Sequence, residues 1–132
     1  MKVAPKASPK ASPKASSVDL DGLSAANSQL LDGYLDSIWM ERGLSRNTLE
    51  SYGRDLKFFV HWLQVNNETI LGASRHQILA YLTHRVEQGI TARSSARALS
   101  SIRSLYRFLV REERISEDPT LRIENPILGR KL

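Results

Sequence analysis

The chain has 132 residues, enough for one folded domain but not for two large ones. It contains no cysteine, which excludes disulfides and thiolate metal sites, and the spacing of its three histidines does not suggest a zinc site, so we expect neither a metal ion nor a cofactor. The net charge of +5 favours a polyanionic partner. Since no apolar run approaches the length of a membrane span, we expect a soluble, cytoplasmic protein that makes no contact with membranes.

Residues 1–26 are predicted to form a disordered, basic tail. The motif PKAS occurs three times in succession, and a proline at every fourth position is incompatible with a helix. The first 17 residues carry four lysines and no acid. The tail is therefore either an inert extension or an arm that contacts DNA phosphates without sequence preference.

The first predicted helix covers residues 28–43 and ends at Gly43. Its polar positions are mostly acidic, which makes it a poor candidate for contact with DNA. Asp32 and Asp36, one turn apart, are interpreted as solvated side chains rather than as a metal or acid–base site. The positions predicted to be buried are Leu31, Leu35, Ile38 and Trp39.

The second predicted helix covers residues 45–64. Either Ser45 or Asn47 can cap it, and Asn47 and Glu50 have the spacing of a capping box. Its buried stripe is predicted to be Leu49, Tyr52, Leu56, Phe59, Val60 and Leu63. The opposite face carries Glu50, Arg54, Lys57 and His61.

The third predicted helix covers residues 74–89, with a capping box formed by Ser74 and Gln77 and with Gly89 as its stop. Its inward-facing residues are predicted to be Ile78, Leu79, Leu82 and Val86.

The fourth predicted helix, residues 91–112, is amphipathic and basic. One stripe consists of Ser95, Leu99, Ile102, Tyr106 and Leu109, flanked by Ala98, Leu105 and Val110. The opposite side carries Arg93, Arg97, Ser100, Ser104, Arg107 and Arg111. Like charges spaced four residues apart repel each other, so either phosphate groups offset this repulsion or the stripe is simply a solvated face. Phe108 falls beside the basic stripe without an explanation from the pattern.

Together these segments predict an all-α fold, a compact four-helix bundle over residues 27–118, followed by an extended connector from residue 119 to 132. The core is expected to include Trp39, Tyr52, Phe59, Leu82, Leu99, Ile102 and Tyr106. The sequence contains no glycine-rich phosphate loop, HExxH motif or nucleophile elbow. The four tyrosines fall at or near apolar stripes and are interpreted as core residues rather than nucleophiles.

Two long motifs resemble a known family. "RGLSRNTLESYGRDLKFFVHWL" and "RSSARALSSIRSLYRFLVREERISEDPT" are similar to the N-terminal, SAM-like core-binding domain of Xer-type tyrosine recombinases, over residues 28–132. The resemblance implies that the second and fourth helices cross and enter the major groove of DNA. It carries over nine candidate DNA-binding residues: Arg46, Asn47, Thr48, Ser51, Arg54, Arg93, Ser94, Arg97 and Ser101.

The catalytic residues of that family match no position in this sequence, so we expect DNA binding without cleavage. The implied partners are a double-stranded recombination half-site and, in a full-length protein, a second Xer-type recombinase; we expect the isolated domain to be monomeric. The alternatives are a phage-type integrase domain and a helical protein-interaction module. A helix-turn-helix transcription factor is disfavoured because another helix separates the second and fourth helices.

Overall fold

The computed structural model describes residues 22–124, which form four α-helices and confirm the predicted all-α class. Their bounds are α2, Ala25–Arg42; α3, Arg46–Val65; α4, Arg75–Glu87; and α5, Ala92–Arg111. The chain divides into two units, Met1–Leu44 and Ser45–Leu132. The predicted disorder of residues 1–21 and the last part of the predicted connector, residues 125–132, lie outside the described residues.

Helix α2 belongs to the first unit and is longer than predicted. Ser24 caps its start by accepting a hydrogen bond from the backbone N–H of Asn27 at 3.2 Å, and Gly43 ends it in the left-handed conformation. The buried side chains of this helix are Leu31, Tyr34 and Ile38. The prediction that Trp39 is buried is wrong, since 47% of it is exposed. Trp39 lies one position, or about 100°, beyond Ile38 around the helix.

Local capping determines where α3 and α4 begin. Ser45 caps α3 by accepting a hydrogen bond from the N–H of Thr48 at 3.1 Å, so the capping box predicted for Asn47 and Glu50 does not form. The capping box of α4 is confirmed. The side chain of Ser74 accepts from the N–H of Gln77 at 3.3 Å, and the side chain of Gln77 accepts from the N–H of Ser74 at 2.7 Å.

Aromatic side chains from three helices form the core of the second unit. The ring of Phe59, on α3, lies edge-on to Tyr81 of α4 at 5.2 Å and to Tyr106 of α5 at 6.4 Å between centroids. The hydroxyl of Tyr106 donates to the carbonyl of Ile70 at 2.7 Å. Burial raises the pKa of Tyr106 and, to a smaller extent, so does the charge of Asp118, so this phenol stays a protonated donor.

Most of the predicted inner positions are confirmed. The buried residues among them are Leu31, Ile38, Leu56, Phe59, Val60, Leu63, Ile78, Leu82, Ser95, Ala98, Leu99, Ile102, Leu105, Tyr106 and Leu109. Another group is only half-buried: Leu35, Leu49, Tyr52, Leu79 and Val110.

Two predicted orientations are wrong. Val86 is 45% exposed, because Arg85 lies closer to the line through Ile78 and Tyr81 and takes the inward position near the end of α4. Ser104, placed on the solvated face of α5, is buried.

The residues that follow α5 fold back onto it. Glu113 adopts a positive φ of 60°, and the N–H of Arg114 donates to the carbonyl of Leu109 at 2.9 Å. Further on, the side chain of Arg103 donates to the carbonyl of Ile123. Thr120 and Ile123, which the sequence assigned to the connector, are buried and therefore pack with the helical domain.

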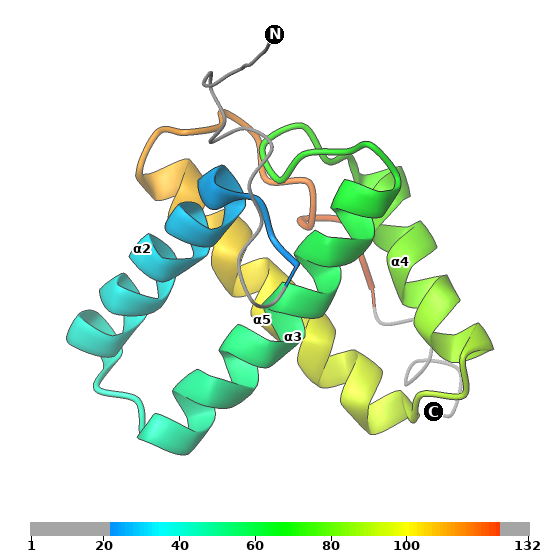
Figure 1. Ribbon diagram of the computed structural model, residues 1–132, viewed down its shortest axis with the longest axis horizontal. Helices are drawn as coiled ribbons and strands as arrows, with labels where there is room; N and C mark the ends of the chain where they lie inside the picture. The colour runs from blue at the N-terminus through cyan, green and yellow to red at the C-terminus, as the bar shows by residue number, and fades with distance from the viewer. Residues whose placement is uncertain (1–21, 125–132) are drawn as a thin grey trace, which may run out of the picture. The chain divides into compact units, whose positions relative to one another are not determined.

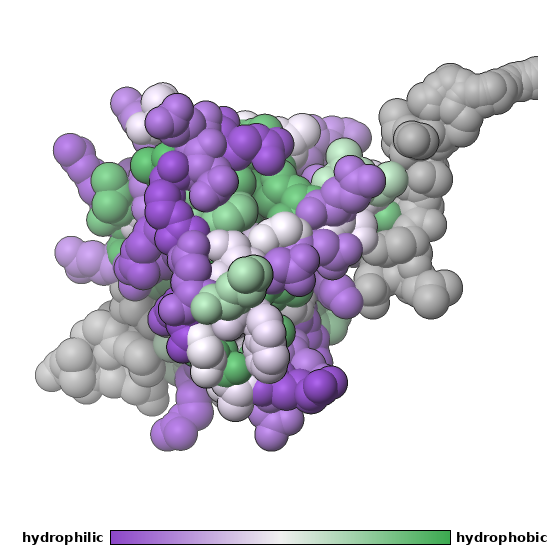
Figure 2. Space-filling model, turned by 90° about the vertical axis from the view of Figure 1, so that its left-hand side faces the viewer, coloured by the Kyte–Doolittle hydropathy of each residue, from purple (hydrophilic) through white to green (hydrophobic). Residues whose placement is uncertain are grey.

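Figure 1 shows α3 and α5 crossing near their middles, with the first turns of both helices on the same side of the crossing. On the face drawn in Figure 2, hydrophilic side chains predominate and hydrophobic ones show in separate areas. Among residues 22–124, no helix combines the length and the apolar character needed to cross a membrane.

Candidate nucleic-acid interface

An ion pair between a buried carboxylate and a partly exposed arginine joins α3 to α5. Asp55, on α3, is 3% exposed, and its two carboxylate oxygens accept from Nε and Nη2 of Arg97 at 2.9 and 3.0 Å. This two-bond geometry is the strong form of an arginine–carboxylate contact. The hydrogen bond with Asp55 and the negative charge of Asp55 raise the pKa of Arg97. Arg97 therefore holds the two helices together and neutralises the acid between them.

Ser101 completes this contact. It is buried, and its hydroxyl lies 3.3 Å from Oδ2 of Asp55 and 3.2 Å from the carbonyl of Arg97. Of the nine candidate DNA-binding residues, Ser101 is thus placed inside the helix crossing rather than on the surface. Its position allows it to orient Asp55, but not to reach a DNA groove directly.

The remaining candidates lie in the amino-terminal halves of the two helices, and the first turns of these helices lie on the same side of the crossing (Figure 1). Four are exposed: Arg46, Asn47, Arg54 and Arg93. Ser51 and Ser94 are half-buried. Thr48 is also half-buried, and its hydroxyl accepts from the capping hydroxyl of Ser45 at 3.0 Å, which gives it a role in the helix start.

Three exposed arginines on this surface have no acidic partner among the described residues. Arg46, Arg54 and Arg93 form no ion pair with any residue in the described part of the chain. The first turns of α3 and α5 also contain no acid, and the amino-terminal end of a helix carries a partial positive charge. Exposed guanidinium groups near the amino-terminal ends of two crossing helices form a surface suited to binding phosphate.

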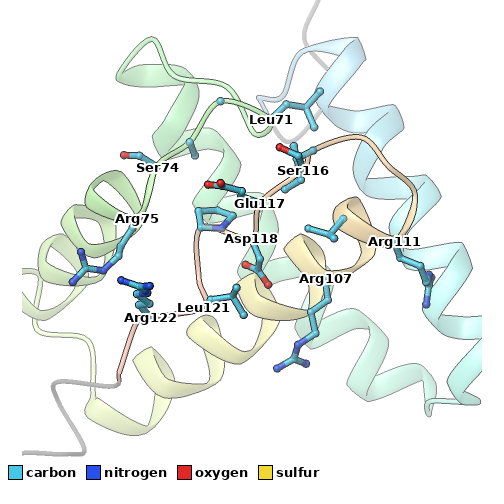
Figure 3. A pocket seen from close by; sticks show the side chains of 15 residues that line it. Leu71, Ser74, Arg75, Arg107, Arg111, Ser116, Glu117, Asp118, Leu121 and Arg122 are labelled. Carbon is cyan, nitrogen blue, oxygen red and sulfur yellow. The ribbon is translucent and has the colours of Figure 1, made fainter.

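The other end of the basic stripe has a different environment. Arg107 and Arg111 line a cavity of about 970 Å³ together with Glu117 and Asp118, and Figure 3 shows both arginines projecting from α5. Arg111 also lies 3.8 Å from Glu112 and above the ring of Phe108 at 5.7 Å from its centroid. Arg111 thus has an acidic neighbour, whereas Arg93, at the amino-terminal end of the stripe, forms no ion pair among the described residues.

The tyrosines are placed as expected for core residues. Tyr34, Tyr81 and Tyr106 are buried, and Tyr52 is half-buried. Burial raises the pKa of Tyr81, an effect that its contact with Arg85 partly offsets. A phenol that attacks a phosphodiester must be reachable by the DNA backbone, so none of these buried groups is placed to act as a nucleophile.

Asp55 is the functional residue that the sequence analysis missed. Its neighbours Arg54 and Lys57 suggested a solvated stretch, and no pattern within α3 marks an acid as buried. The sequence did contain a signal, in the other helix. An acid next to Leu56, in a buried stripe, requires a hydrogen-bond donor. Arg97 and Ser101, spaced one turn apart on α5, are two such donors.

Comparison with known proteins identifies the family of this domain. Residues 31–113 match the family described as "Phage integrase, N-terminal SAM-like domain". The chain is 44% identical over 110 residues to the tyrosine recombinase XerD of Pseudomonas aeruginosa, covering 83% of this chain and 37% of that protein. It is 41% identical over 106 residues to XerD of Yersinia pestis, covering 80% of this chain and 36% of the relative.

The chain thus spans just over a third of the length of these curated relatives. The match to the family covers more than half of the chain and includes all four helices, α2 in part. The resemblance seen in the two sequence motifs is therefore confirmed: the chain belongs to the phage integrase N-terminal SAM-like domain family and is similar to the corresponding part of XerD tyrosine recombinases.

Proposed function

We propose that this chain is the DNA-binding module of a site-specific tyrosine recombinase, and that it grips one face of a recombination half-site with the first turns of α3 and α5. The observation that carries the proposal is the ion pair between Asp55 and Arg97. It joins two helices that cross with their first turns on the same side of the crossing (Figure 1). The major groove is wide enough to admit a helix, and a fixed crossing presents two helices to it at once.

The candidate residues then take different roles. Arg46, Arg54 and Arg93 would contact phosphates or guanine edges, because arginine is suited to both. Asn47 has the side chain that pairs with adenine, while Ser51 and Ser94 would contribute shorter contacts near the helix starts. Arg97 would reach DNA only with the part of its guanidinium that Asp55 leaves exposed. Thr48 and Ser101 would act by positioning the helices.

The relatives are tyrosine recombinases, and this extends the proposal. A tyrosine recombinase acts at DNA, so we infer a cytoplasmic protein whose partners are duplex DNA and a second Xer-type recombinase, with a role in resolving chromosome dimers. The described residues would bind DNA without cutting it. A phage-type integrase domain would use the same surface, and a helical protein-interaction module would not need unpaired arginines at two helix N-termini.

Binding to a recombination half-site and to a scrambled duplex, over a range of salt concentrations, tests the proposal. Replacing Arg93 by alanine should weaken binding by roughly 1–3 kcal/mol if it reads a base, or lower the salt slope by about 1 if it holds a phosphate. Arg75→Ala, at an exposed position on α4, is the matched control and should change neither quantity. Equal binding by the parent, Arg93→Ala and Arg54→Ala would contradict the groove-facing arrangement.

A further inference from the structure

A second cavity, of about 700 Å³, lies between the carboxyl-terminal halves of α3 and α4. Aromatic rings from both helices line it. The ring centroids of Trp62 and Tyr81 are 5.4 Å apart, and the ring of His84 lies 6.4 Å from that of Trp62. The proposed DNA contacts use the other half of α3, so they do not involve this cavity.

The rim of the cavity is apolar and open to solvent. Phe58 is 60% exposed and Val65 is 66% exposed, and Ile90, which also lines the cavity, is 39% exposed. Small-molecule sites are typically cavities of about 300–1,000 Å³ with apolar and aromatic walls and a few polar groups. The size and the walls of this cavity therefore fit a small ligand with a flat, apolar body.

The full charge in the lining comes from one arginine. Among the described residues that line the cavity, Arg85 is the single arginine or lysine, and there is no aspartate or glutamate. The guanidinium of Arg85 lies 5.8 Å from the centroid of the Tyr81 ring, and its Nη1 donates to the hydroxyl of Tyr81 at 3.3 Å. One guanidinium without an acidic partner in the cavity matches a ligand with one negative charge.

The hydrogen-bonding capacity of Arg85 is not filled. Its Nε is buried and has no hydrogen-bond partner among the described residues. A buried donor without an acceptor is costly, and a carboxylate binds a guanidinium best through two parallel N–H···O bonds. The side chain of Arg85 is only half-buried, so it has room to turn. A turn that brings Nε and a terminal nitrogen to a carboxylate would replace one long bond to Tyr81 with two charge-assisted bonds.

We propose that this cavity is a binding site for a small aromatic carboxylate. The ring of the ligand packs against Trp62 and Phe58, and its carboxylate pairs with Arg85. A phosphate monoester fits less well, because it carries roughly −1.5 to −2 charges at pH 7 and the lining offers one guanidinium. The cavity shown in Figure 3 is a weaker candidate for such a ligand, because Glu117 and Asp118 lie among its arginines.

An amide chemical-shift titration of the isotope-labelled chain with 1-naphthoate, without DNA, tests the proposal. We expect saturable shifts at Trp62, His84 and Arg85, with a dissociation constant of roughly 0.1–1 mM for a ligand of this size. The uncharged 1-naphthamide has the same rings and should bind at least about tenfold more weakly, because it cannot form charge-assisted bonds with Arg85. We also expect weaker binding of 1-naphthyl phosphate.

Variants of the cavity locate the site. Arg85→Gln should weaken the binding of naphthoate by about tenfold. Because Arg85 also contacts Tyr81, Phe58→Asp provides a second variant at a largely exposed position, where it removes a ring and places a like charge beside the ligand. Arg75→Gln, at an exposed position on α4 outside the cavity, is the matched control and should bind naphthoate like the parent. Circular dichroism should confirm that each variant is folded.

The outcome is independent of the DNA-binding function, because Arg93→Ala, on the DNA-facing surface, should bind naphthoate like the parent. Naphthoate that causes no saturable shifts, or that binds Arg85→Gln and Phe58→Asp as tightly as the parent, would overturn the proposal. Naphthamide or naphthyl phosphate binding as tightly as naphthoate would overturn it as well, since the ligand would then not be recognised as a carboxylate.

Discussion

The ion pair between Asp55 and Arg97 predicts that the double variant, which lacks both side chains, is more stable than the variant that lacks Arg97 alone. The Asp55 side chain is 4% exposed, whereas the Arg97 side chain is 47% exposed. Replacing Arg97 by alanine leaves a buried carboxylate with Ser101 as its remaining side-chain donor. Replacing Asp55 by alanine leaves a guanidinium that water can reach. Both substitutions remove the same ion pair, but Arg97→Ala should lower the free energy of unfolding more than Asp55→Ala does.

The magnitudes follow from the exposure of each partner. Breaking a fully buried ion pair from one side costs about 3–5 kcal/mol, and partial exposure of Arg97 reduces this to about 2–4 kcal/mol for Arg97→Ala. Asp55→Ala should cost about 1–2 kcal/mol, mainly through lost hydrogen bonds. The double variant removes the unpaired buried charge, so it should be more stable than Arg97→Ala by on the order of 1–2 kcal/mol.

Urea unfolding of the four proteins, followed by circular dichroism at neutral pH, measures these differences. The urea concentration at the unfolding midpoint should be lowest for Arg97→Ala and should rise when Asp55→Ala is added. The slope of the unfolding free energy against urea concentration should be the same for all four proteins. If the double variant were less stable than Arg97→Ala, or equally stable, the carboxylate of Asp55 would not be a buried charge that depends on Arg97, and the account of the helix crossing would be refuted.

Three further predictions concern the core and the tail. Leu99→Ala should destabilise the domain by about 2–5 kcal/mol in the same unfolding assay, and an unchanged melting temperature would show that the buried side of α5 is wrongly assigned. Tyr106 has a raised pKa in the folded state, so the unfolded chain loses its proton first and stability should fall as the pH rises above about 10, by up to about 1.4 kcal/mol per pH unit. Tyr106→Phe should show a shallower decline, to which Tyr81 still contributes, whereas an identical slope would argue against a buried phenol. Deleting residues 1–17 should lower the salt slope of DNA binding and leave the melting temperature unchanged; an unaltered slope would favour an inert tail.

Hydrophobic periodicity was sufficient to predict the four helices and most of their buried residues. Ser74 and Gln77, for example, identified the start of α4 because a capping box depends only on residues close in sequence. The nine candidate contact residues came from the family resemblance, and on α5 the basic stripe selected Arg93 and Arg97 independently.

Several predictions that failed depended on contacts between elements distant in sequence. Ser101 looked like a surface hydroxyl, but Asp55, 46 residues earlier, draws it into the helix crossing. The error at Val86 is of a different kind, because the angular position of Arg85 within α4 already places it closer to Ile78 and Tyr81. Thr120 and Ile123 lack a helical period, yet the contact of Arg103 with Ile123 ties their segment to α5. A helical wheel describes one element at a time and cannot represent these partners.

The central claim is that the first turns of α3 and α5 together face DNA. The most direct measurement is an amide chemical-shift titration of the isotope-labelled chain with a recombination half-site duplex. The account predicts that the largest changes occur around Arg46, Asn47 and Arg54 on α3 and around Arg93 and Ser94 on α5, with small changes at Arg75 and along α4. Changes concentrated on α4 or α2, with the first turns of α3 and α5 unaffected, would contradict it.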